Sequence, residues 1–140
     1  MFAARNLKTV VVVATGLLGL LAFPLAAHHS TAMFVWGKDV AMTGATVERW
    51  EWTNPHTFLY VSVPRGGGIE HWAFEGMSPN HLSRIGWSRK SLLPGQTINL
   101  TYYALKDARK GGFNVSVTLP GGQVLHQLEN PNDRPDKPGS

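Results

Sequence analysis

The sequence predicts a small β-barrel that is all-β except for one short helix. Short segments rich in β-branched and aromatic residues recur along the chain, which is typical of strands. Turns rich in glycine, proline and asparagine separate them at close spacing, which favours a barrel over an open sheet. The helical segment follows the third expected strand. This order of elements is that of an OB-like Greek-key barrel, so we expect five to six strands in that topology.

The strands follow from the local pattern. In order, they are expected at residues 40–52, 57–63, 69–74, 97–105, 113–120 and 123–128. Gly44 inside the first strand predicts a bulge or a sharp bend. The "TNPH" segment at 53–56 predicts a turn, because asparagine before proline starts turns and proline fixes φ. We expect hairpin loops at "PRGGG", residues 64–68, and at "KDARKGG", residues 106–112.

The helix is expected within residues 78–87. Ser78 is a suitable N-cap, and Pro79 fits the first helical position, where its missing N–H would have no helical partner. Apolar residues three apart follow, and Gly86 ends the pattern.

Residues 1–27 have the order of a secretory signal peptide: a short basic start, an apolar run and small residues before a cleavage site. Pro24 interrupts the apolar run, which is short for a membrane span of about 20 residues. A retained N-terminal anchor is the alternative. The domain is expected at residues 28–128, and the polar tail at 129–140 is expected to be disordered. We therefore expect a periplasmic or secreted protein without a stable membrane span after cleavage.

Composition narrows the function classes. The 140 residues include 13 Lys and Arg and 9 Asp and Glu, a formal net charge of +4. Removing the signal segment removes Arg5 and Lys8, which leaves 11 basic residues against 9 acidic ones and a net charge of +2. So small a charge argues against a nucleic-acid partner. Because the chain has no cysteine, it has no disulfide, thiol nucleophile or thiolate metal site.

The N-terminal histidines predict a metal site. Cleavage after Ala27 would make His28 the first mature residue, with an α-amine and a ring nitrogen for one metal ion. A second histidine would complete a three-nitrogen site, which suits Cu(II). We expect His56 in the "TNPH" turn to be that histidine. His29 and Met33 are secondary candidates, with the Met33 thioether as a soft ligand for Cu(I).

Each histidine also has a structural interpretation. The two N-terminal histidines would be only a soluble start to the mature chain. His56 would donate to a backbone carbonyl and hold its turn, which is compatible with a ligand role. We expect His71 to face a sheet as a structural residue, and His81 and His126 to be solvated.

The alternative function is an interaction module. Trp50, Trp52 and Trp72 would form an aromatic barrel face that binds an envelope protein, a glycan or a small apolar ligand. Asn54 and Trp87 complete this candidate set. The structural interpretation is that these rings form the barrel core and its cap.

No pattern indicates catalysis. The serines lie in no nucleophile-elbow sequence, and the carboxylates have no spacing that marks an acid–base pair. The glycines at 66–68 join two strands rather than opening a helix, so they do not form a phosphate loop. We therefore expect a non-enzymatic protein.

Several segments carry a resemblance to a known family. They are "AHHSTAMF" at 27–34, the stretch 43–61 around "WTNPH", the stretch 72–96 around "EGMSPN", and the stretch 107–125. In these segments the chain resembles the DUF6152 family of small exported bacterial proteins, whose function is unknown. The resemblance implies a signal peptide followed by a β-rich domain, and it implies no reaction. Val35 and Trp36 stand where a Phe–Asp pair is more usual in that family.

Overall fold

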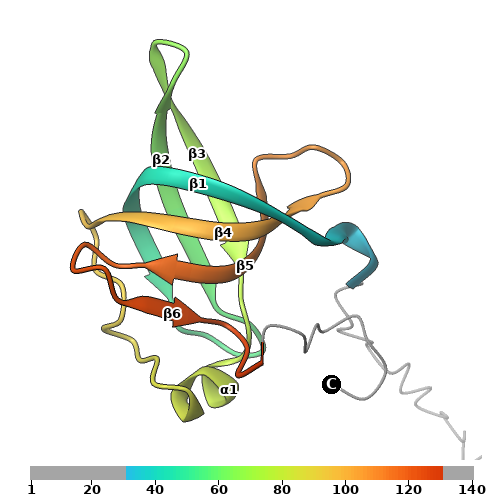
Figure 1. Cartoon of the computed structure of the whole chain (residues 1–140), viewed down its shortest axis with the longest axis vertical. Coiled ribbons are helices and arrows are strands. Elements are labelled where there is room, and N and C mark those ends of the chain that lie inside the picture. The colour runs from blue at the N-terminus through green and yellow to red at the C-terminus, as the bar shows by residue number, and fades with distance from the viewer. Residues whose placement is uncertain (1–30, 131–140) are drawn as a thin grey trace, which may run out of the picture.

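A computed structural model describes residues 31–130 of the chain (Figure 1). In order, the elements are η1 (Thr31–Met33), β1 (Phe34–Glu51), β2 (Phe58–Arg65), β3 (Gly68–Glu75), α1 (Pro79–Arg84), β4 (Thr97–Leu105), β5 (Gly111–Thr118) and β6 (Val124–His126). The expected signal peptide, His28, His29 and the tail from residue 131 onward lie outside the described residues.

The strands form a closed five-stranded barrel with one extra strand. The sheet order is β3-β2-β1-β4-β5-β6, and a parallel pairing of β3 with β5 closes the ring. β5 pairs with β3 through its first residues and with β6 through its last ones, so β6 extends the sheet beside the closure. Figure 1 shows α1 at one end of the barrel, between β3 and β4 along the chain. The OB-like barrel predicted from the sequence is confirmed.

β1 begins at Phe34, earlier than the predicted start at Val40. Its first part has no alternating pattern because the pairing with β4 is irregular there: the register shifts between Phe34 and Asp39, and Gly37 has a φ of 74°. Gly44 confirms the predicted bulge, with a φ of 68° and a second shift of register around it.

Glycines are the cause of two of the other differences between the predicted and observed strand boundaries. The β2–β3 hairpin turns on Gly66 and Gly67 alone, both at positive φ, so the strands run further than the loop predicted at 64–68. β5 begins at Gly111 rather than at residue 113, because its two glycines take part in the parallel pairing with β3.

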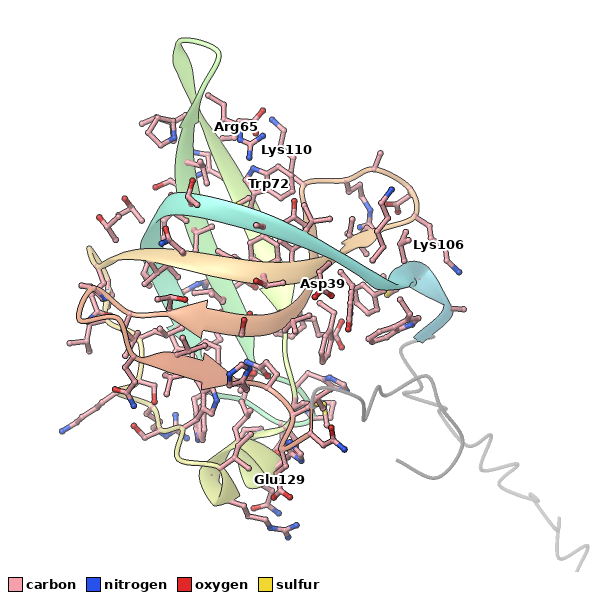
Figure 2. All side chains as sticks on the ribbon, in the orientation of Figure 1. Asp39, Arg65, Trp72, Lys106, Lys110 and Glu129 are labelled. Atoms are coloured by element: carbon pink, nitrogen blue, oxygen red, sulfur yellow. The ribbon has the colours of Figure 1, made fainter. Side chains whose placement is uncertain are left out.

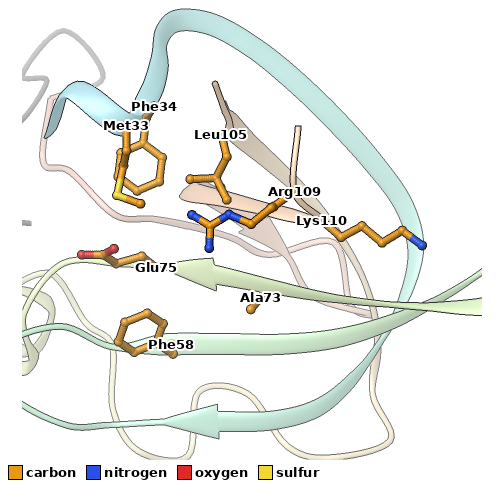
Figure 3. Close-up of a pocket in the computed structure, with 9 residues that line it drawn as sticks. Met33, Phe34, Phe58, Ala73, Glu75, Leu105, Arg109 and Lys110 are labelled. Carbon is orange, nitrogen blue, oxygen red and sulfur yellow. The ribbon is translucent and has the colours of Figure 1, made fainter. Parts of the chain in front are cut away.

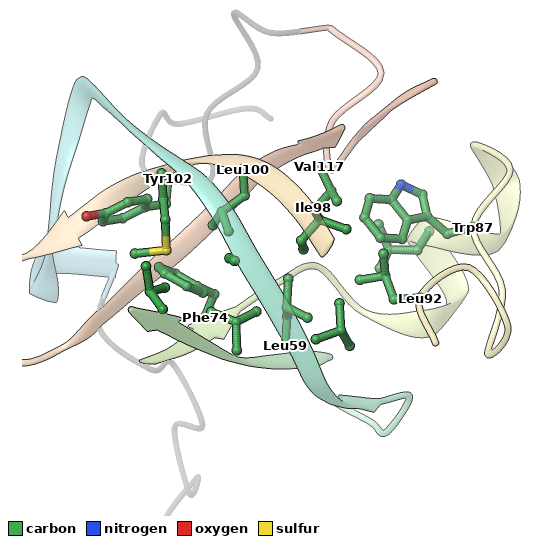
Figure 4. Packing of buried hydrophobic residues seen from close by; sticks show 14 residues of the cluster. Leu59, Phe74, Trp87, Leu92, Ile98, Leu100, Tyr102 and Val117 are labelled. Carbon is green, nitrogen blue, oxygen red and sulfur yellow. The ribbon is translucent and has the colours of Figure 1, made fainter. Parts of the chain in front are cut away.

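The barrel interior is filled by aliphatic and aromatic side chains from every strand except β6 (Figure 4). The segment after β3 closes one end, where Leu82, Trp87 and Leu92 are at most 3% exposed. The predicted cap of α1 is confirmed, since the His81 backbone N–H donates to Ser78 Oγ at 3.3 Å.

A second, smaller cluster lies at the start of β1. Phe34, Tyr103 and Phe113 are buried there, and the Trp36 ring lies 5.1 Å from that of Tyr103 and 5.3 Å from that of Phe113. These contacts hold the first residues of β1 against β4 and β5, and Met33 packs against the same cluster.

Candidate functional site

An open hollow of about 260 Å³ lies beside the end of β3 (Figure 3). Its apolar walls are Met33, Phe34, Phe58, Ala73 and Leu105. Its polar and backbone contributions come from Glu75, Arg109, Lys110 and Gly112. The lining therefore joins the start of β1, the paired strands β2 and β3, and the loop between β4 and β5. These strands and this loop are among the parts of an OB-fold that bind ligands.

His56 lies in the connection between β1 and β2, and its side chain is 29% exposed. Its Nδ1 is 2.8 Å from Glu75 Oε1 and 3.1 Å from the Gly76 carbonyl oxygen. A carbonyl oxygen only accepts hydrogen bonds, so Nδ1 carries a proton. A neutral ring in this tautomer has its lone pair on Nε2, the nitrogen that would then bind a metal ion. The interpretation in which His56 donates to a backbone carbonyl is confirmed.

The backbone that His56 contacts is held by buried polar groups. Gly76 N–H donates to the Thr57 carbonyl at 2.9 Å, and Thr57 Oγ1 donates to the Met77 carbonyl at 2.9 Å. Gln127 Oε1 accepts from the Met77 N–H at 2.8 Å. Thr57 and Gln127 are fully buried, so the carbonyl that accepts from His56 belongs to a rigid part of the structure.

Glu75 links the histidine to the hollow. It is 9% exposed, it ends β3, and it lines the hollow while Oε1 contacts His56. A histidine with one ring nitrogen on a carboxylate is the usual arrangement for a metal ligand, because the carboxylate fixes the ring and strengthens the other nitrogen as a donor.

Basic side chains on the β4–β5 loop border the hollow. Arg109 Nε donates to Asp107 Oδ2 at 2.7 Å, and this hydrogen bond lowers the pKa of Asp107. Lys110 Nζ lies 3.0 Å from Glu70 Oε1. That hydrogen bond, together with a weaker one from the Trp72 indole, lowers the pKa of Glu70.

The structure places part of the predicted metal site in one region. Met33 lines the hollow and His56 contacts the carboxylate of Glu75 at its edge, while His28 and His29 lie outside the described residues. Within residues 31–130, no three His, Cys, Asp or Glu side chains form a group that could hold a metal ion.

The remaining histidines lie elsewhere. The exposed His71 contacts Glu48 at 2.7 Å on the sheet. His126 is exposed. The expectation that His81 is solvated is wrong: it is half-buried, and its Nε2 lies 2.9 Å from the carbonyl oxygen of Gln127, in the segment that follows β6.

The predicted aromatic set is divided by the fold. The Trp50 ring lies 5.8 Å from that of Trp52 and 5.5 Å from that of Trp87. The indole N–H of Trp50 donates to the Ser88 carbonyl and that of Trp87 to the His126 carbonyl. These three rings therefore pack together beside the barrel core, as the structural interpretation expects.

Trp72 and Asn54 lie apart from those contacts. The Trp72 ring stacks at 6.1 Å on Phe74 and lies 6.0 Å from Tyr102. Figure 2 shows Trp72 near Arg65, whose guanidinium carbon is 5.9 Å from the ring centroid. Asn54 is exposed in the turn before a cis Pro55.

Sequence reasoning assigned no site role to Glu75 or Arg109. Glu75 ends a strand and Arg109 lies in a charged loop, and neither position has a local pattern that marks a ligand contact. The Asp107-x-Arg109 spacing is the one sequence feature that could have indicated a loop arginine held by its neighbour.

No helix within residues 31–130 is long and apolar enough to cross a membrane.

Comparisons with known proteins give one match. A family model described as "Family of unknown function (DUF6152)" matches residues 17–114, which is more than half of the chain. That range includes every residue that lines the hollow, and also His28, His29 and His56. The comparison with curated proteins and the comparison with solved structures gave no match. The chain belongs to the DUF6152 family, a family of unknown function.

Proposed function

We propose that this protein is an exported, non-enzymatic copper-binding protein of the periplasm or the extracellular space. Copper would be held by His28, the mature N-terminal residue, through its α-amine and ring, and by Nε2 of His56. Met33 would supply a thioether when the ion is Cu(I), and His29 is a further donor.

The observation that carries the proposal is the setting of His56. Its Nδ1 faces a carboxylate at 2.8 Å and a carbonyl oxygen at 3.1 Å, so the ring orientation and tautomer are fixed before any metal binds. A fixed ring loses little conformational freedom on binding, and the partly buried carboxylate favours a cation nearby.

The chain length allows the N-terminal donors to reach this histidine. His28 precedes Met33 by five residues, which span at most about 17 Å when extended. Met33 lines the same hollow as Glu75, the partner of His56. Three nitrogen donors and a nearby thioether form a set that accommodates both oxidation states of copper, whereas zinc and magnesium need no thioether.

The test is native mass spectrometry of the exported protein before and after one equivalent of Cu(II). We expect a chain that begins at His28 and retains one copper ion. His56→Ala should lose the ion, and His71→Ala, which removes an exposed histidine with a similar carboxylate contact, should retain it. A chain that begins elsewhere, or a His56→Ala protein that still holds copper, would overturn the proposal.

The interaction-module alternative is supported by Trp50 and Trp52, which are in contact and half-exposed. It predicts that Trp52→Ala abolishes capture of an envelope component while His56→Ala leaves it unchanged. The copper proposal predicts that His56→Ala loses copper. The two variants therefore distinguish the alternatives.

A further inference from the structure

Arg109 lies at the mouth of the hollow, where its side chain is 66% exposed and is hydrogen-bonded to its neighbour Asp107. Asp107 accepts twice from it: Oδ1 from the backbone N–H at 3.2 Å and Oδ2 from Nε at 2.7 Å. Ala108 between them has a φ of 59°, in the left-handed region that alanine seldom adopts. Such strain concentrates at functional loops, and here it belongs to the turn that presents Arg109.

The free end of the guanidinium faces the hollow. Figure 3 shows Arg109 with Met33 and Phe34 on one side and Glu75 on the other. Asp107 takes Nε, and Figure 3 shows the terminal nitrogens of Arg109 pointing toward Phe34 and Glu75. Among residues 31–130, Asp107 is the one acidic residue within ion-pair distance of Arg109.

The rest of the hollow is mostly apolar. Phe34 is buried, and Phe58 and Leu105 are half-buried, with aromatic and aliphatic surface turned to the same space. A volume of about 260 Å³ is slightly below the usual range for small-molecule sites, which limits the hollow to a small ligand. An apolar wall beside one oriented guanidinium is complementary to a molecule with an apolar body and one carboxylate, which arginine pairs with through two parallel hydrogen bonds.

We propose that the hollow binds a small apolar monocarboxylate, with Arg109 as its anion-binding residue and Phe34, Phe58 and Leu105 around its apolar body. Lys110 adds a second positive charge, reduced by its ion pair with Glu70. The site borders the proposed copper site and shares Met33 and Glu75 with it, but it requires no metal.

Glu75 sets the charge that the hollow accepts. Its carboxylate lines the same space, with Oε1 2.8 Å from His56 Nδ1, and it opposes any anion that enters. The Arg109 guanidinium, whose charge Asp107 partly balances, offers its terminal nitrogens to one carboxylate, whereas phosphate or a dicarboxylate brings a second charge without a second oriented partner. The hollow should therefore favour monoanions.

The test is an NMR titration of metal-free protein, with chelator present, using benzoate and hexanoate as probes. We expect saturable shifts at Ala73, Phe58 and Gly112, and binding of benzyl alcohol that is at least about tenfold weaker. Arg109→Gln should weaken benzoate binding at least about tenfold, and Arg84→Gln on α1 should leave benzoate binding unchanged. Glu75→Gln should tighten benzoate severalfold by removing the like charge.

Four outcomes would overturn this inference. The first two are that Arg109→Gln binds benzoate as tightly as the unchanged protein, and that benzyl alcohol binds as tightly as benzoate. The other two are that phosphate binds as tightly as benzoate, and that no resonance around the hollow shifts at millimolar probe. Because the titration contains no copper, its failure leaves the copper proposal standing. A failure of the copper proposal in the mass spectrometry likewise leaves the carboxylate result unaffected.

Discussion

At the residue scale, His56 combines a structural and a proposed functional role in one ring. Donation to Gly76 ties the β1–β2 connection to the end of β3, and the contact with Glu75 orients the same nitrogen. A histidine used only to hold a turn would need the carbonyl alone. The additional carboxylate, which is 9% exposed, is the feature that a metal ligand would use.

Replacing that carboxylate should weaken copper binding more than it lowers the stability of the fold. Glu75→Ala leaves the Gly76 acceptor in place but removes the carboxylate that helps to fix the orientation of the ring. We expect the copper dissociation constant to rise about 10- to 100-fold, measured by competition with a chelator of known affinity. Glu48→Ala is the matched control, since Glu48 contacts the exposed His71 at 2.7 Å, and it should leave copper affinity unchanged. Equal losses in the two variants would contradict a specific role for Glu75.

At the element scale, the sequence was most informative where polar and apolar residues alternate over several positions. β4 has the predicted bounds, Thr97–Leu105, and in its first half buried Ile98 and Leu100 alternate with the exposed Thr97 and Asn99. The start of β1 could not be predicted because Gly37 and a shifted register break the alternation. Gly111 and Gly112 look like part of a loop in sequence, and only the parallel pairing with β3 makes them strand residues.

Gly112 should be essential to the close pairing of β5 with β4. A Cβ at this position would overlap the Tyr103 carbonyl oxygen and lie 2.8 Å from Cδ2 of Tyr102, and a backbone oxygen in a paired strand has little room to move. Gly112→Ala should lower the free energy of unfolding by at least about 2 kcal/mol, measured by urea denaturation.

Gly121→Ala is the control for that experiment, because nothing lies within 4 Å of the added methyl group and its φ is not in the left-handed region. The control should be neutral or stabilising by up to about 1 kcal/mol. Similar stabilities for the two variants would show that β5 does not lie this close to β4 at Gly112 in solution.

At the scale of the whole molecule, the candidate site depends on barrel closure. His56 and Met33 could be singled out in the sequence because histidine and methionine are metal ligands by residue type. Glu75 and Arg109 could not, because the hollow joins residues from Met33 to Gly112 that only the closed ring brings together. No local spacing encodes that convergence.

The proposed N-terminal copper ligands precede the buried core along the chain, and this order gives a prediction for the whole domain. Among residues 31–130, the first buried side chain is Phe34, so a chain that begins at Ser30 keeps every buried side chain of the described domain and loses His28 and His29. Without metal, its melting temperature should equal that of the chain that begins at His28.

With free copper at 100 times the dissociation constant, binding to the folded state should stabilise the longer chain by about 2.7 kcal/mol. For a domain of this size, that raises the melting temperature by on the order of 10 °C, measurable by circular dichroism. The chain from Ser30 should show no rise at the same copper concentration, because His56 and Met33 alone provide too few donors for a tight site. An equal rise in both chains would place the copper elsewhere on the protein, and a lower melting temperature of the metal-free shorter chain would show that the N-terminal residues serve the fold itself.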